Sequence, residues 1–67
     1  MEIEQRLAER VRRLRREKGW SQEELADRAG LHRTFISQIE RSVKRTTIRS
    51  LQKVAEALGV TFGELLD

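Results

Sequence analysis

The sequence predicts an all-α fold of five short helices packed in one domain. Apolar residues recur at helical spacing in separate stretches, glycines follow three of those stretches, and capping boxes open two of them. No segment shows the alternation of a convincing strand. The 67 residues contain no proline, no repeat and no long linker, and they suffice for one modest core. We therefore expect residues 1–67 to form a single domain.

The first helix is expected to end just before Gly19. Four apolar residues, Ile3, Leu7, Val11 and Leu14, recur at the spacing of one helical face, with arginines and glutamates on the other side. Glycine often follows a helix because it readily adopts the left-handed backbone conformation that ends one.

The second helix is predicted over about residues 21–29. Ser21 and Glu24 have the spacing of a capping box, in which each side chain satisfies a free backbone amide of the first turn. Gly30 can take the left-handed conformation that ends the helix. The side chains expected to face the core are Leu25, Ala26 and Ala29.

The third helix is predicted over about residues 32–41, with Ile36 and Ile39 on its buried side. Gly30 and Leu31 alone separate it from the second helix, or His32 as well. Two short helices joined so tightly must cross steeply, which is the geometry of a helix-turn-helix.

The last two helices are expected to begin after Thr47 and Thr61. Thr47 is a suitable cap for the fourth helix, which ends at Gly59, and Thr61 forms a second capping box with Glu64. The apolar residues that keep the helical period are Ile48, Leu51, Val54, Ala55 and Leu58, followed by Phe62, Leu65 and Leu66.

The residue content argues against catalysis. Cysteine is absent and His32 is the single histidine, so neither a thiolate site nor a histidine cluster can hold a metal. There is no glycine-rich phosphate loop, and the carboxylates fall on exposed helical faces beside arginines. We expect no catalytic residue, no metal and no cofactor.

The chain also shows no sign of a membrane segment. No apolar run approaches the ~20 residues that span a bilayer, and the N-terminus is acidic and polar where a signal peptide would be basic and then apolar. Together with the missing cysteines, this favours a cytoplasmic protein with no membrane partner.

Basic residues are concentrated between residues 41 and 55. The whole chain has a formal net charge of +3, but this segment holds five basic residues and no acid. Such a field suits a phosphate backbone, although a solvated face without acids would show the same pattern. The five residues are Arg41, Lys44, Arg45, Arg49 and Lys53.

The outward face of the third helix carries candidates for reading DNA bases. Arg33 can donate two hydrogen bonds to guanine, Gln38 can pair with adenine, and Thr34 can contact a thymine methyl group. Arg33 could instead bind a phosphate or an acidic neighbour, and Ser37 either joins the base contacts or only permits a close approach. Phe35 flanks this surface and is expected to pack toward the fourth helix, with contact to a thymine methyl group as the alternative.

Three segments make the chain resemble the Cro and phage-repressor type of helix-turn-helix regulators. They are residues 12–16 (RRLRR), 20–41 (WSQEELADRAGLHRTFISQIER) and 48–66 (IRSLQKVAEALGVTFGELL). The resemblance implies a lambda-repressor-like DNA-binding domain whose third helix makes the base contacts. Within it, LHRTFISQIE is similar to the third helix of restriction-modification controller proteins.

Contacts to the DNA backbone are expected from both ends of the motif. Gln22 lies in the first turn of the second helix, where free amides favour a phosphate, and the resembled family places a glutamine there for that purpose. The residues that follow the third helix are expected to bind phosphates on the far side. They are Arg41, Lys44, Arg45, Thr46 and Arg49.

The chain departs from the resembled family at three places. Ser42 stands where that family often has glycine, and Arg45 and Thr46 stand near its asparagine-proline, so the loop before the fourth helix could follow another path. His32 stands where serine or threonine is usual, which makes it a poor cap or a phosphate donor.

A regulator of this kind is expected to act as a homodimer on a pseudo-palindromic operator, because one reading helix covers too few base pairs. The candidate dimer surface consists of Val60, Phe62, Leu65 and Leu66, which could also simply close the core. RNA polymerase is a further candidate partner through Glu23, Glu24 and Asp27. The alternative function is an antitoxin-like or adaptor module with secondary DNA binding.

Overall fold

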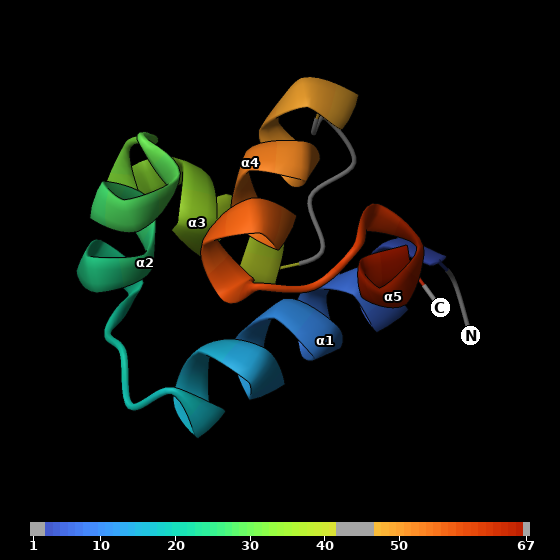
Figure 1. Cartoon of the computed structure of the whole chain (residues 1–67), viewed down its shortest axis with the longest axis horizontal. Helices are drawn as coiled ribbons and strands as arrows, with labels where there is room; N and C mark the ends of the chain where they lie inside the picture. The colour runs from blue at the N-terminus through green and yellow to red at the C-terminus, as the bar shows by residue number, and fades with distance from the viewer. Residues whose placement is uncertain (1–2, 42–46, 67) are drawn as a thin grey trace.

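The computed structural model describes the backbone of residues 3–41 and 47–66, and the side chains of residues 5–41 and 47–66 (Figure 1). All regular secondary structure in these residues is helical, so the predicted all-α, five-helix fold is confirmed. The helices are α1 (Ile3–Glu17), α2 (Gln22–Ala29), α3 (Arg33–Glu40), α4 (Ile48–Leu58) and α5 (Phe62–Leu66).

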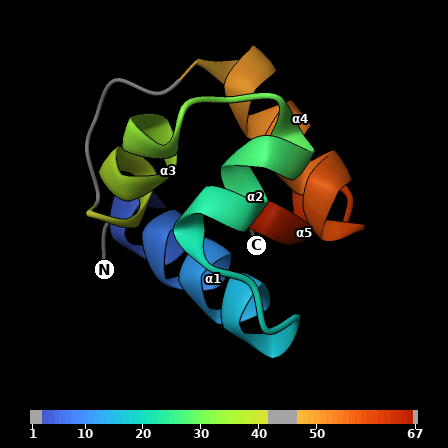
Figure 2. The same ribbon diagram turned by 90° about the vertical axis from the view of Figure 1, so that its left-hand side faces the viewer.

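All five helices contribute to one core. Helix α2 packs against α3 and α4, while α1 packs against α3 and α5. Figure 2 shows α2 between α3 and α4, with α1 crossing below them. The inward faces predicted for the second and third helices are confirmed. The buried cluster consists of Val11, Leu25, Ala26, Ala29, Ile36, Ile39, Leu51, Val54, Ala55, Leu58 and Leu65.

The two predicted capping boxes differ in the structure. At α5 the box is complete, because the Thr61 amide donates to Glu64 Oε1 at 2.9 Å and the Glu64 amide donates to Thr61 Oγ1 at 3.0 Å. At α2 the Glu24 amide donates to Ser21 Oγ at 3.0 Å. The Glu24 carboxylate accepts a hydrogen bond from Arg28 Nε at 2.8 Å instead of reaching back.

The turn between α2 and α3 follows from Gly30. Its φ of 69° lies in the left-handed region that glycine adopts without a steric penalty. This conformation lets the Leu31 amide donate back to the Ala26 carbonyl at 2.9 Å, which closes the end of α2. His32 occupies the cap position of α3 without a side-chain cap hydrogen bond. This agrees with a poor cap, and it leaves the exposed side chain available for the alternative role of phosphate donor.

Ile48 corrects the expected pattern of α4. The helical period predicts it on the buried face, but it is 64% exposed. Ile48 is the first residue of α4, and Leu51, almost one turn later, is the first α4 residue that is buried in the core. The apolar pattern in the sequence therefore starts one helical turn before the first α4 residue that is buried in the core.

Candidate nucleic-acid interface

The outer face of α3 gathers the four predicted base-reading side chains. They line one hollow of about 300 Å³ at the surface, together with the residue that ends the helix. On the opposite side, Ile36 and Ile39 are buried among the core residues and hold α3 in place. The hollow is lined by Arg33, Thr34, Ser37, Gln38 and Arg41.

The exposure of these side chains differs along α3. Arg33, Thr34 and Gln38 are exposed, whereas Ser37 is half-buried. Three of the four residues are thus accessible to a partner, and both roles suggested for Ser37 stay open. Phe35 is half-buried and packs against the core.

Glu40, the last residue of α3, is an acid buried in the fold. Arg15 of α1 donates to its carboxylate twice, from Nε to Oε2 at 2.7 Å and from Nη2 to Oε1 at 3.0 Å. Arg15 also donates from Nη1 to the Trp20 carbonyl at 2.8 Å. This network ties α1, the segment before α2 and the end of α3 together.

Two opposing effects set the ionisation of Glu40. Burial raises the pKa of its carboxyl, while the hydrogen bonds from Arg15 and Gln22 and the positive charges of Arg15 and Arg12 lower it. The favourable contacts prevail, and the pKa lies below its ordinary value of 4.5. Glu40 is therefore a carboxylate at neutral pH.

Gln22, the first residue of α2, belongs to the same network. Its Nε2 donates to Glu40 Oε1 at 3.2 Å. An amide nitrogen carries two N–H groups, so this contact leaves one for a partner outside the protein. The end of α3 and the first turn of α2 consequently lie side by side.

A family model described as helix-turn-helix matches residues 11–65. The chain belongs to the helix-turn-helix family. The match includes α2, α3 and α4 in full, and the resemblance to the Cro and phage-repressor type is confirmed. This is a family of transcription regulators.

Similar proteins include regulators from several bacteria. The chain is 47% identical over 60 residues to a hypothetical transcription factor of Neisseria meningitidis, covering 90% of this chain but only 57% of that protein. Restriction-modification controller protein C.AhdI from Aeromonas hydrophila superposes with a TM-score of 0.87 at 35% identity, covering 92% of this chain and 94% of the other. SinR, the master regulator for biofilm formation, solved in complex with DNA, superposes with a TM-score of 0.84 at 39% identity, covering 91% and 98%.

The other predicted phosphate contacts of this helix-turn-helix protein are only partly described. Arg41 caps the end of α3 and is exposed, and Arg49 is exposed in the first turn of α4. Lys44, Arg45 and Thr46 lie outside the described residues, as does Ser42.

One of the four residues predicted for the dimer surface is not accessible in the structure. Leu65 is 1% exposed and closes the core, so a partner could not reach it without opening the fold. Val60 and Phe62 are half-buried against the core, and Leu66 is half-buried. Val60 and Phe62 also line a hollow of about 300 Å³ where α4 meets α5.

The described part of this helix-turn-helix protein offers no metal site. The side chains of residues 5–41 and 47–66 include no group of three from His, Asp or Glu that could hold an ion. None of their helices is both long and apolar enough to cross a membrane.

Sequence reasoning missed Glu40. The signal was present, because Glu40 follows Ile36 by four residues and Ile39 by one, which puts an acid on the buried face of α3. An acid at such a position requires a cationic partner, and the RRLRR segment supplies several arginines.

Proposed function

We propose that this protein regulates transcription by binding an operator in double-stranded DNA, with α3 in the major groove. The main support for this proposal is the outer face of α3, which presents exposed hydrogen-bonding side chains. The opposite face of α3 is buried in the core and holds the helix in place. A helix fits the major groove, where each base pair presents its own pattern of donors, acceptors and methyl groups.

The side chains of α3 divide the readout among different bases. Arg33 binds the O6 and N7 atoms of a guanine through two parallel hydrogen bonds. Gln38 pairs with the N6 and N7 atoms of an adenine, and Thr34 contacts a thymine methyl group. Arg33 and Thr34 begin α3, where recognition helices meet base edges. Ser37 joins them or permits the close approach of the backbone.

Phosphate contacts fix the orientation of α3 on the duplex. Gln22 supplies an amide at the positive end of α2, while Arg41 and Arg49 supply charge at the end of α3 and the start of α4. Lys44, Arg45 and Thr46 of the intervening segment are included in this proposal on sequence alone.

The protein acts as a homodimer. One α3 reads too few base pairs to find a site in a genome, and a second copy doubles the readout. The α4–α5 hollow with Val60 and Phe62 supports the proposal, because it offers apolar side chains away from the α3 face. The Cα atoms span 28 × 20 × 19 Å, a size that allows two copies side by side to reach half-sites about 34 Å apart.

Residues 1–67 act as one DNA-binding domain in the cytoplasm. The shared core of the five helices supports the single domain. RNA polymerase remains a proposed partner through the exposed acids Glu23 and Asp27. Glu24 contributes less to such a patch because Arg28 occupies its carboxylate.

Selection of binding sites from a random duplex pool tests this function. The expected result is an enriched pseudo-palindrome whose half-sites are one helical turn apart or a multiple of that. A parallel selection with the Arg33→Ala and Gln38→Ala variants should change the preferred base at different positions of each half-site. A pool that stays random after several rounds would contradict operator recognition.

A further inference from the structure

Arg12 of α1 has a partner at the end of α3 but no full counter-charge. Its Nη2 donates to the backbone carbonyl of Glu40, and its Nε lies 3.8 Å from Glu40 Oε1. Arg15 makes the two short hydrogen bonds to that carboxylate and is only 11% exposed as a side chain. The single negative charge of Glu40 thus faces two guanidinium groups, and the hydrogen bonds of Arg15 occupy the carboxylate.

The exposure of Arg12 agrees with this division. Its side chain is 39% exposed, although Arg12 contacts a residue that is itself buried. A guanidinium group has five N–H donors, and the Glu40 carbonyl accepts one of them. Arg12 is therefore anchored on one side and accessible on the other.

Arg12 lies beside two of the proposed phosphate contacts, Gln22 and Arg41. The Glu40 carbonyl belongs to the peptide unit that leads into Arg41, which lines the α3 hollow. Gln22 Nε2 lies 3.2 Å from the same Glu40 oxygen that lies 3.8 Å from Arg12 Nε. The first turn of α2, whose free amides attract anions, is therefore a neighbour of the Arg12 guanidinium.

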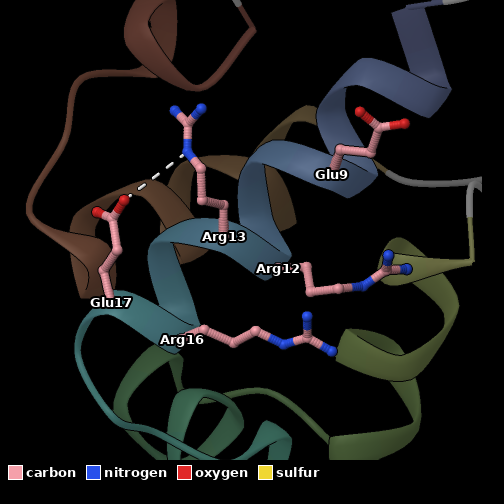
Figure 3. Close-up of a pocket in the computed structure, with 5 residues that line it drawn as sticks. All are labelled: Glu9, Arg12, Arg13, Arg16 and Glu17. Carbon is pink, nitrogen blue, oxygen red and sulfur yellow. Dashed lines mark ion pairs between the residues drawn. The ribbon is translucent and has the colours of Figure 1, made fainter.

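A surface hollow on α1 gives access to Arg12. It measures about 460 Å³ and is lined by Glu9, Arg12, Arg13, Arg16 and Glu17. Figure 3 shows Arg12 and Arg16 extending in the same direction, with Glu9 above Arg12 in this view. Arg13 points elsewhere and pairs with Glu17 at 3.9 Å. Among the residues that line this hollow, Arg13 forms the ion pair with Glu17, while the guanidinium groups of Arg12 and Arg16 point the other way.

We propose that Arg12 binds a phosphate of the DNA backbone next to the phosphate contacted by Gln22, or the same one. This inference rests on the proposed DNA binding and adds a contact from α1. Because the Glu40 carbonyl already holds the guanidinium, little side-chain freedom is lost on binding. The planar group can then meet two phosphate oxygens at once.

The salt dependence of DNA affinity tests the role of Arg12. The Arg12→Gln variant should weaken binding to the selected operator and to random duplex by a similar factor. It should also reduce the slope of log Kobs against log salt by about one unit, because one phosphate contact is lost. The matched control is Arg13→Gln, which removes an arginine from the same hollow and should leave the slope unchanged.

The outcomes separate this inference from the proposed function. A wild-type slope in Arg12→Gln would overturn the phosphate contact while DNA binding itself stands. A wild-type protein that binds no duplex at any salt concentration would overturn both. Circular dichroism of the variant over the same range of salt concentrations is the control for unfolding. If the folded fraction is constant over that range, partial unfolding lowers Kobs by the same factor at every salt concentration and does not change the slope.

A second variant keeps the inference testable if Arg12→Gln does not fold. Arg12→Lys keeps the positive charge, and the amine that it introduces can be acetylated and followed by mass spectrometry. Bound operator should slow acetylation at position 12 at least several-fold, while Lys18 serves as an internal comparison. Equal acetylation rates at position 12 with and without operator would overturn the proposal.

Discussion

Arg15 and Glu40 form a two-hydrogen-bond ion pair, at 2.7 and 3.0 Å, that joins α1 to the last residue of α3. Side-chain exposures of 11% and 3% shield the pair from water. The apolar contacts of Ile36 and Ile39 hold α3 against the core, and the ion pair fixes where its end lies relative to α1. The orientation of the proposed reading helix thus depends on a buried contact that is not part of its outer face.

Removal of either partner of this pair should strongly destabilise the fold. Arg15→Ala leaves the Glu40 carboxylate buried without its main donor, and such a loss costs about 3–5 kcal/mol in the free energy of unfolding. Urea denaturation measures it. Arg13→Ala is the control, because the Arg13–Glu17 pair is exposed and its loss should cost about 1 kcal/mol or less. Similar losses for the two variants would contradict the structural role of Arg15.

The free energy of unfolding should fall in acid because the Glu40 carboxylate becomes protonated. Its folded-state pKa lies below the ordinary 4.5, so the carboxylate stabilises the fold above pH 4.5 and this contribution disappears as the pH falls through the folded-state pKa. The wild type should therefore exceed Glu40→Gln in unfolding free energy at pH 7, and the difference should shrink below about pH 4.5.

Urea titrations of both proteins between pH 7 and pH 2.5 measure this difference. The comparison cancels the other acids, including Glu64, whose pKa is also lowered because its carboxylate accepts the Thr61 amide. A difference that is constant over the whole range would mean that Glu40 does not stabilise the fold as an anion.

Arg33 and Arg49 should affect DNA binding in different ways. Arg33→Ala should relax the preference at one base pair by about 1–3 kcal/mol, whereas Arg49→Ala should weaken all sequences alike and reduce the salt slope by about one unit. Titrations against the operator, single-base variants of it and random duplex distinguish the two. Equal losses on operator and random DNA for both variants would refute the division of roles.

The α4–α5 hollow should determine the oligomeric state. Val60→Asp places a charge among the residues that line it, and a buried unpaired charge is costly, so the variant should be monomeric. Ile48→Asp is the control, because Ile48 is exposed and does not line that hollow. Sedimentation equilibrium at micromolar concentration compares them. A wild type that stays monomeric on its operator would exclude the dimer.

Local signals in the sequence account for most of the fold that could be predicted. Gly30 and Gly59 adopt the left-handed conformation, and Ser21 and Thr47 cap their helices, because such features depend on neighbouring residues alone. The exposure of Ile48 depends on where the core ends in space. The spacing of apolar residues along a helix gives no information about that position.

The sequence predicts the residues on the outer face of α3, but not the contacts of Glu40 that fix the end of this helix. The spacing of Ile36 and Ile39 places the polar residues of α3 on the opposite side. The arginine partners of Glu40 lie in a run of arginines more than twenty residues earlier in the chain. Only the packing of α1 against α3 decides that Arg15 receives the carboxylate and Arg12 the carbonyl.

The affinity ratio between operator and random duplex, titrated at ~150 mM salt near physiological ionic strength, tests the central claim most directly. Sequence readout by α3 predicts that the selected operator binds at least about a thousandfold more tightly than random DNA. A ratio near one, with weak binding that disappears as salt increases, would contradict the claim and leave only the attraction of basic side chains for phosphate.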